Sequence, residues 1–393
     1  MLIGLVGKPN VGKSTFFKAA TLADILIANY PFATIKANHG IAHVRIDCID
    51  KELNVQCEPR TGYCKNHQRF VPVELMDVAG LVEGASEGKG LGNQFLDDLR
   101  QADVFIHIID VSGETDAEGK PTKDYNPVND VKMLETELDK WYAGILNKVW
   151  RTFARTIQNT KEDFSKAVAK QFSGLKVDED QVKIILKKLE FDPEKPADWT
   201  AEQIFNFARE LRMLTKPMII AANKSDKEKS SENIKKLREA YPDYLIIPCS
   251  ADSELSLRQA DKAGLINYIP GDKEFSIKED LNEKQKTALE SIKKNVLDAF
   301  GSTGVQDILN KAVFDLLNYM AIFPAGSKLK DSEGRILPDC FLMPPNSSAL
   351  DFAYKLHTDI GDKFIKAVLL KTKQAVGKDY KLKHRDGVEI VTR

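Results

Sequence analysis

Residues 1–21 read MLIGLVGKPNVGKSTFFKAAT, and the segment GKPNVGKS at residues 7–14 decides the fold. The apolar run at residues 2–6 before it predicts a buried parallel strand, and residues 15–21 after it are compatible with a helix. The segment itself fits G-x-x-x-x-G-K-[ST], the phosphate-binding loop (P-loop), and strand, glycine loop and helix in this order are its structural context. The sequence therefore predicts a doubly wound, mainly parallel α/β sheet that binds a nucleotide.

Each residue type in this loop has a chemical reason. Gly7 and Gly12 permit a close approach of the backbone, whose N–H groups and following helix attract phosphates. Lys13 can reach the β and γ phosphates, and the hydroxyl of Ser14 suits Mg²⁺. The residues expected to bind the phosphates are Gly7, Lys8, Pro9, Asn10, Val11, Gly12, Lys13, Ser14 and Thr15.

A second motif follows the predicted strand at residues 69–76, where the chain continues as Asp77-Val78-Ala79-Gly80. Asp77 can hold Mg²⁺ through a water molecule, and the N–H of Gly80 can sense the γ-phosphate. Thr34 lies between the P-loop and Asp77 and is expected to complete the magnesium shell. Magnesium is thus expected at Ser14, Thr34 and Asp77, and the residues expected to act in hydrolysis are Lys13, Thr34 and Gly80.

Two further motifs indicate guanine. The predicted strand at residues 217–222 ends in Asn223-Lys224-Ser225-Asp226, and the strand at residues 244–248 leads to Cys249-Ser250-Ala251. The carboxylate of Asp226 can accept hydrogen bonds from guanine N1–H and the 2-amino group, which adenine lacks, so adenine would leave a buried acceptor unpaired. The residues expected to bind the base are Asn223, Lys224, Asp226, Ser250 and Ala251.

The segments NYPFAT (29–34) and DVAGLVEGASEGKGLGNQFLDDLRQAD (77–103) resemble the Obg-like GTPases of the YchF-like branch. The resemblance implies a low intrinsic turnover, because Leu81 stands where Ras-type enzymes carry a water-orienting glutamine. Asn10 matches an asparagine that helps to hold K⁺ in potassium-stimulated relatives; the alternative is an asparagine that only shapes the turn. The best-known YchF-like proteins have a degraded N-x-x-E motif and accept ATP. The intact motif here predicts GTP over ATP.

The C-terminal segments LDFAYKLHTDIGDKFIKAVL (350–369) and KDYKLKHRDGVEIVTR (378–393) resemble a TGS domain, a small β-grasp fold. This resemblance implies a ribosome or RNA partner. Residues 352–393 contain ten Lys and Arg residues against five Asp and Glu, which agrees with an acidic partner. Taken alone, this charge favours the alternative of a solvated lysine-rich surface. His357 is expected to cap or pack a helix.

Helical patterns fill residues 128–214, and Thr200 with Gln203 predicts a capping box at the start of the last helix. Charged, largely helical sequence follows residue 255, and residues 304–320 have helical spacing that suits a closing helix. The expected layout is a G domain at 1–126 and 206–255, helical insertions at 127–205 and 256–300, a closing helix at 301–320 and a TGS domain at 321–393.

The composition limits the classes of protein. The chain has 393 residues, 42% hydrophobic and 29% charged, with a net charge of −1, which favours several globular domains without a specific indication of DNA binding. No apolar run is long enough for a membrane span, the first residues do not fit a signal peptide, and five cysteines do not form a disulfide framework, so a cytoplasmic location is expected. Cys57, Cys64 and His67, with Cys48 as a fourth ligand, could hold zinc; ordinary thiols and a loop histidine are the alternative.

These features favour a GTP-binding switch that hydrolyses GTP slowly and acts with the ribosome. Two alternatives remain from the sequence. One is a broad ATP/GTP hydrolase that acts in stress signalling through protein partners. The other is an RNA-binding module gated by nucleotide, with negligible turnover.

Overall fold

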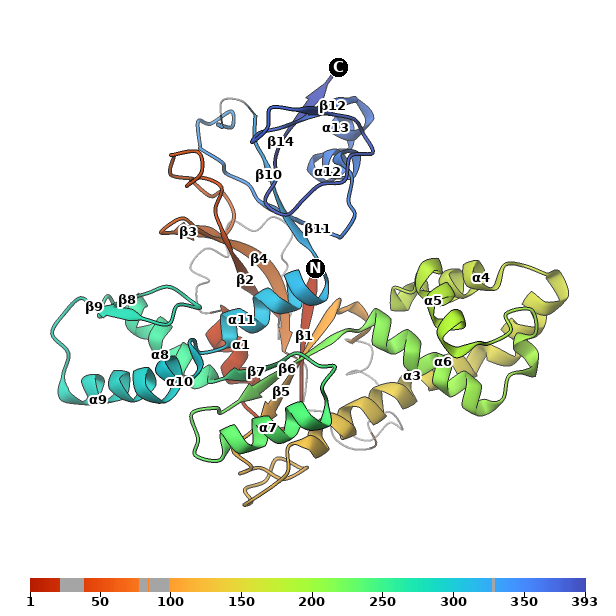
Figure 1. The fold of residues 1–393 in the computed structure, drawn as a ribbon, viewed down its shortest axis with the longest axis horizontal. Helices are drawn as coiled ribbons and strands as arrows, with labels where there is room; N and C mark the ends of the chain where they lie inside the picture. Colours follow the sequence, from red (N-terminus) through yellow and green to blue (C-terminus); the bar gives the residue numbers. More distant parts are fainter. Residues whose placement is uncertain (22–38, 78–83, 85–98, 327–328) are drawn as a thin grey trace. The chain divides into compact units, whose positions relative to one another are not determined.

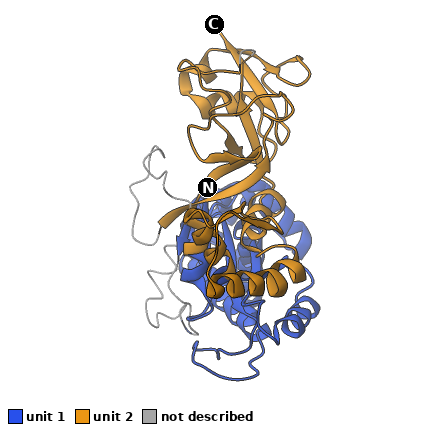
Figure 2. Cartoon of the chain, turned by 90° about the vertical axis from the view of Figure 1, so that its left-hand side faces the viewer, with its two compact units in different colours: residues 1–17, 75–252 blue, residues 18–74, 253–393 orange. Residues whose placement is uncertain are grey.

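The computed structural model describes residues 1–21, 39–77, 84, 99–326 and 329–393, which form two compact units (Figure 2). One unit contains residues 1–17 and 75–252, and the other contains residues 18–74 and 253–393. Each unit is therefore assembled from two separate stretches of the chain. The predicted site residues Thr34 and Gly80, and also Leu81, lie outside the described residues.

The central sheet has seven strands in the order β2-β4-β1-β5-β6-β7, with β3 pairing antiparallel to β4 (Figure 1). β1 pairs with β5, β5 with β6 and β6 with β7, all in parallel. This mainly parallel sheet confirms the predicted doubly wound α/β fold. Apolar runs such as LIGLV form its strands because strands of such a sheet are buried on both faces. The strands are β1 (Leu2–Val6), β2 (His39–Asp47), β3 (Tyr63–Lys65), β4 (Gln68–Asp77), β5 (Val104–Asp110), β6 (Met218–Asn223) and β7 (Ile246–Cys249).

Helices occupy the chain between β5 and β6, as the sequence predicts, and α3 to α6 form one group in Figure 1. Their shared core contains a cluster of aromatic rings that includes Trp150, Phe164, Trp199 and Phe207. The predicted capping box is confirmed, since the Thr200 side chain accepts from the Gln203 N–H and the Gln203 side chain accepts from the Thr200 N–H. The helices are α1 (Lys13–Thr21) after the P-loop, then α3 (Val128–Thr160), α4 (Phe164–Gln171), α5 (Glu179–Leu189), α6 (Ala201–Thr215) and α7 (Ser230–Ala240), with short 3₁₀ turns at Ser173–Leu175 and Pro196–Asp198.

The segment at 256–300, expected to be a largely helical insertion, also contains the antiparallel hairpin of β8 and β9. Strands of three residues are too short to give an alternating pattern in the sequence. The helix expected at 304–320 ends at residue 316, since Asn318 adopts a left-handed φ of 53° and Met320 begins β10. The elements are α8 (Ala251–Lys262), β8 (Ile266–Tyr268), β9 (Phe275–Ile277), α9 (Glu283–Ile292), a π-helical turn (Lys293–Leu297), α10 (Asp298–Phe300), α11 (Val305–Asn310) and a second π-helical turn (Lys311–Leu316).

The C-terminal region forms a five-stranded sheet in the order β11-β10-β14-β12-β13, in which β10 and β14 are parallel. Phe352 of α12 is fully buried against this sheet, and His357 caps α13 by accepting from the Asp359 N–H. The predicted small β-grasp domain is confirmed. Its elements are β10 (Met320–Pro324), β11 (Phe341–Met343), α12 (Ala349–Leu356), α13 (Thr358–Asp362), β12 (Phe364–Leu369), β13 (Ala375–Val376) and β14 (Gly387–Thr392).

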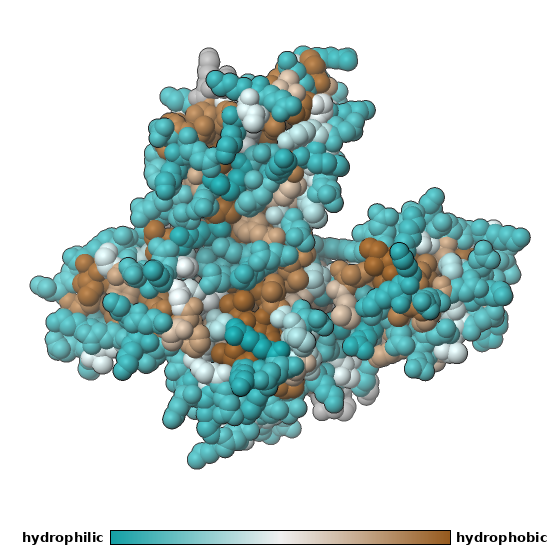
Figure 3. Space-filling model, viewed as in Figure 1, coloured by the Kyte–Doolittle hydropathy of each residue, from teal (hydrophilic) through white to brown (hydrophobic). Residues whose placement is uncertain are grey.

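Hydrophilic side chains cover most of the face in Figure 3, and hydrophobic side chains gather there in smaller groups. Within the described ranges, no helix combines the length and the apolar character that crossing a membrane requires.

Candidate nucleotide-binding site

The P-loop leaves β1 and enters α1 through two glycines in conformations that other residues rarely adopt. Gly7 has φ 147° and Gly12 has φ 97°. A Cβ atom on Gly7 would lie 2.5 Å from the carbonyl oxygen of Ile108, and one on Gly12 would lie 2.3 Å from Nδ2 of Asn223. Both positions thus require glycine for backbone conformation and for space.

Lys13 lies inside this loop. Its ammonium group donates to the carbonyl oxygens of Gly7, at 3.0 Å, and Lys8, at 2.7 Å. Burial lowers the pKa of Lys13 to about 8, and the nearby charge of Asp77 acts in the opposite direction. The first turn of α1 therefore holds a poorly solvated cation, which favours an anionic ligand.

Ser14 and Asp77 meet beside the loop, where the Ser14 hydroxyl donates to Oδ2 of Asp77 at 3.0 Å. A hydroxyl and a carboxylate oxygen are ligands that Mg²⁺ prefers, so this pair fits the ion that the sequence predicts. Thr15, which is also expected to bind phosphate, follows Ser14 in α1.

Asn223 links the phosphate end of the site to the base end. Its Nδ2 donates to the carbonyl oxygen of Val11 at 2.8 Å, and its Oδ1 accepts from the N–H of Ala251 at 3.1 Å. The side chain is buried at the carboxyl end of β6. One amide thus fixes the P-loop, the NKSD segment and the Ser250-Ala251 segment relative to one another.

Asp226 and Ser250 form the other end of the site. The Ser250 hydroxyl donates to Oδ1 of Asp226 at 2.9 Å, and the Asp226 side chain is 30% exposed. Its carboxylate is therefore oriented by a partner and remains accessible to a ligand.

Lys224 is held by a residue that the sequence reasoning missed. Its ammonium group donates to Oδ2 of Asp110 at 2.7 Å, and the same oxygen accepts from the Thr115 hydroxyl. Oδ1 of Asp110 accepts from the Ser112 hydroxyl. Burial raises the pKa of Asp110, but the hydrogen bond and charge of Lys224 and the bonds from the two hydroxyls lower it by more. The sequence did contain an indication of this residue, because Asp110 ends the apolar strand β5 at the sheet edge where ligands bind.

Lys8 also has a role that the motif does not reveal. Its side chain is buried, forms an ion pair of 2.9 Å with Asp130 and donates to the carbonyl oxygen of Thr115 at 2.9 Å. It also lies 3.9 Å from the ring centroid of Tyr125. The side chain of Lys8 thus anchors the P-loop to α3, and only its backbone is left for phosphate.

Asn10 shapes the loop in a comparable way. It has a left-handed φ of 62°, and its Nδ2 donates to the carbonyl oxygen of Gly119 at 2.9 Å. The structure therefore shows the kind of contact that is expected if Asn10 shapes the turn. Because Nδ2 makes this bond, Oδ1 is the side-chain atom that could coordinate a cation.

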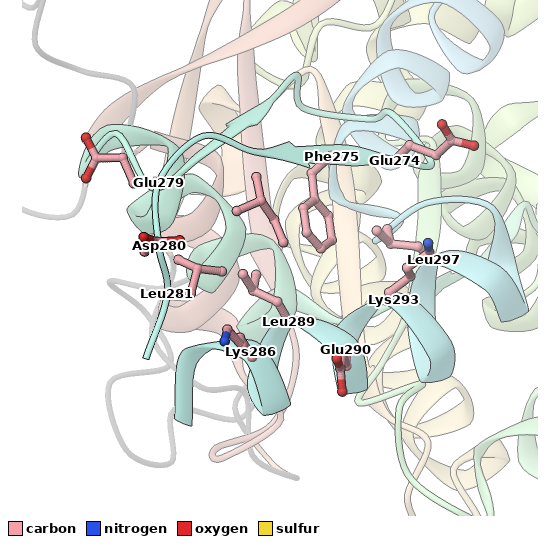
Figure 4. Close-up of a pocket in the computed structure, with 11 residues that line it drawn as sticks. Glu274, Phe275, Glu279, Asp280, Leu281, Lys286, Leu289, Glu290, Lys293 and Leu297 are labelled. Carbon is pink, nitrogen blue, oxygen red and sulfur yellow. The ribbon is translucent and has the colours of Figure 1, made fainter. Parts of the chain in front are cut away.

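A separate pocket of about 490 Å³ lies between β9 and α9 (Figure 4). Acidic and lysine side chains surround its apolar lining, which consists of Phe275, Ile277, Leu281, Leu289 and Leu297. It contains none of the residues predicted to bind nucleotide, and we assign it no function.

The chain matches known families along its length. Residues 2–150 match the family described as "50S ribosome-binding GTPase", residues 221–326 match the "Obg-like GTPase YGR210-like, G4 motif-containing domain", and residues 322–392 match the TGS domain.

Individual relatives agree with these matches. The chain is 49% identical to an uncharacterized GTP-binding protein of Methanocaldococcus jannaschii, over 100% of this chain and 99% of that protein. It is 34% identical to the "Ribosome-binding ATPase YchF" of Mycoplasma genitalium, over 67% of this chain and 71% of that protein. The crystal structure of a GTP-binding protein from Pyrococcus horikoshii superposes with a TM-score of 0.80 at 41% identity, covering 100% of both chains. The chain therefore belongs to the Obg-like P-loop GTPases of the YchF-like branch and carries a C-terminal TGS domain.

Proposed function

We propose that this protein binds GTP and GDP with Mg²⁺, hydrolyses GTP slowly and acts as a nucleotide-dependent switch. The observation that carries the proposal is the position of Asn223, whose amide contacts Val11 in the P-loop and Ala251 beside Asp226. The groups suited to phosphate and the groups suited to guanine are therefore parts of one site.

Within this site the residues have distinct tasks. The backbone N–H groups of the P-loop and the ammonium group of Lys13 would hold the phosphates, while Ser14, Asp77 and Thr34 would hold Mg²⁺. Magnesium, when bound, would neutralise charge on the phosphate oxygens. Gly80 would detect the γ-phosphate through its N–H, and loss of this contact after hydrolysis would release the following segment.

The preference for GTP over ATP rests on Asp226, whose carboxylate is oriented by Ser250 and accessible. Replacing Asp226 by asparagine tests its role. Xanthine has an acceptor oxygen where guanine has its 2-amino donor, and an amide N–H can donate to that oxygen. We expect Asp226→Asn to lose GTP affinity by at least tenfold and to gain affinity for XTP. Asp252→Asn changes an exposed carboxylate of α8 and is the matched control. Unchanged GTP affinity in Asp226→Asn would show that this carboxylate does not select the base.

The proposal that the protein hydrolyses GTP slowly rests on two residues. They are Leu81, through the family resemblance, and Asn10. If Oδ1 of Asn10 holds K⁺ beside the phosphates, GTP hydrolysis will be faster in KCl than in NaCl, and Asn10→Ala will remove the difference. Equal rates in both salts would assign Asn10 to the shape of the loop alone, through its contact with Gly119.

The ribosome proposal rests on the TGS domain and on the name of the Mycoplasma genitalium relative, a "Ribosome-binding ATPase". Lysines of the TGS domain such as Lys366 and Lys378 are exposed, which suits contact with phosphate groups of RNA. We expect the chain to cosediment with ribosomes when it is loaded with a GTP analogue, and less with GDP. Lys366→Glu/Lys378→Glu should weaken this binding, whereas Lys148→Glu/Lys235→Glu, at exposed sites of the other unit, should not. Absence of cosedimentation at low salt in both nucleotide states would contradict the ribosome proposal.

A further inference from the structure

Three cysteines and an aspartate within residues 48–64 converge where β2 ends and the β3–β4 hairpin turns. The sulfur atoms of Cys48, Cys57 and Cys64 and a carboxylate oxygen of Asp50 all lie within 4.8 Å of one another. No other such group of potential metal ligands occurs in the part of the chain that the structure describes. Neither the nucleotide site nor the TGS domain uses these residues.

The spacing of the ligand atoms suits a tetrahedral metal ion. Sγ of Cys48 lies 3.6 Å from Sγ of Cys57, and Sγ of Cys64 lies 3.8 Å from Oδ2 of Asp50. Bonds of about 2.3 Å from zinc to sulfur at tetrahedral angles place two sulfur atoms roughly 3.8 Å apart. A disulfide would require a distance of about 2 Å, and all three cysteines have free thiols.

The backbone holds the four residues in place. The Cys48 N–H donates to the carbonyl oxygen of His67 at 2.8 Å, which ties the end of β2 to the hairpin turn. The Cys57 N–H donates to Oδ2 of Asp50 at 3.1 Å, which closes the loop between them. Cys64 belongs to β3. The ligands are therefore positioned before any ion binds, which lowers the cost of binding.

Asp50 is the residue that ordinary packing explains least. It is fully buried, and a carboxylate is costly to bury unless it is paired or coordinates a metal. Its Oδ1 lies 2.9 Å from Nδ1 of His67, whose side chain is 40% exposed. A carboxylate ligand that is oriented by a second hydrogen-bonding group is a common arrangement around zinc.

We propose that Cys48, Asp50, Cys57 and Cys64 form a structural zinc site, with His67 as the group that orients Asp50. Thiolates favour zinc over Mg²⁺ and Ca²⁺, and four protein ligands leave no open position for a substrate. The ion would join the end of β2 to the β3–β4 hairpin. The sequence offered Cys48, Cys57, Cys64 and His67 as possible zinc ligands, and the structure groups Asp50, rather than His67, with the three cysteines.

The first test measures the metal in the full-length chain, purified without chelator and with a phosphine reductant, by inductively coupled plasma mass spectrometry. We expect one zinc ion per chain, and none in Cys57→Ser or Cys64→Ser. Cys340→Ser is the matched control, because Cys340 is another buried thiol of the same unit but lies outside the group. Iron in place of zinc, or loss of zinc in Cys340→Ser together with its retention in Cys57→Ser, would overturn the assignment.

A second measurement needs no cysteine variant and is therefore independent of folding defects. Replacing the ion by Co²⁺ should give tetrahedral d–d bands and a near-ultraviolet charge-transfer band of an intensity typical of three thiolates. His67→Ala should weaken zinc binding by about 10- to 100-fold, because the orienting partner of a ligand is lost. A cobalt spectrum without thiolate charge transfer, or zinc that leaves all five thiols open to a thiol reagent, would refute the site.

Discussion

The buried ion pair between Lys8 and Asp130 allows the anchoring of the P-loop to be tested quantitatively. The two groups lie 2.9 Å apart, and their side chains are 0% and 2% exposed. Asp130→Asn keeps the shape of the side chain but leaves the ammonium group of Lys8 buried without its counter-charge. Removing one partner of a buried pair costs about 3–5 kcal/mol. For a unit of this size, each kcal/mol corresponds to a decrease in Tm of roughly 2–4 °C.

Urea denaturation of the nucleotide-free protein, followed by tryptophan fluorescence, measures the free energy of unfolding that Asp130→Asn loses. The three tryptophans, Trp141, Trp150 and Trp199, all belong to the same unit as Lys8 and Asp130, so the signal reports this unit.

Two further variants complete this experiment. Lys8→Met/Asp130→Leu replaces the pair by apolar groups and should lose less stability than Asp130→Asn alone. Glu232→Gln removes one partner of the exposed pair with Lys236 and should leave the free energy of unfolding nearly unchanged. An Asp130→Asn variant that is no less stable than Glu232→Gln would refute the anchoring role.

Three other predictions concern residues of the same unit, which contains residues 1–17 and 75–252. Because burial lowers the pKa of Lys13 to about 8 and bound phosphate requires its charged form, GDP affinity should fall by about half between pH 7 and pH 8 and be about tenfold weaker at pH 9 than at pH 7 in fluorescence titrations. A flat profile would contradict this. Burial, together with the charges of Lys13 and Lys8, lowers the pKa of His107 to about 3, so the unfolded chain binds a proton that the folded chain does not between pH 6.5 and 3. This group should therefore contribute about 3 kcal/mol to the loss of stability between pH 7 and pH 4, and that contribution should be absent from His107→Leu in urea denaturation. Gly12→Ala should weaken GDP binding by about tenfold or more in calorimetry, since its φ is 97° and the new Cβ would clash with Asn223, whereas Gly144→Ala, with open space around it, should bind normally.

The parts of the fold that depend on local sequence were predictable. Strand β1 follows from five consecutive apolar residues, and the P-loop follows from glycines at fixed spacing, so both were located to the residue. The capping box at Thr200 is likewise local. The four motifs begin at the carboxyl ends of β1, β4, β6 and β7 because each motif follows a strand.

The contacts that sequence reasoning missed are long-range. Nothing near Lys8 indicates that its side chain pairs with Asp130 on α3, and nothing near Lys224 indicates Asp110. The hairpin of β8 and β9 was missed because its strands have three residues each. Asp50 lies among the three cysteines through the tertiary fold of residues 48–64, which the cysteine and histidine pattern of the sequence does not indicate.

The central claim is selectivity for guanine nucleotides, and competition for a fluorescent GDP analogue tests it most directly. Unlabelled GTP and ATP are titrated against the purified chain with Mg²⁺ present, and the two dissociation constants are compared. If Asp226 reads the base as proposed, GTP will displace the analogue at concentrations at least a hundredfold lower than ATP, since unpaired buried acceptors disfavour adenine. Equal displacement by ATP would contradict the claim and would favour a hydrolase that uses both nucleotides.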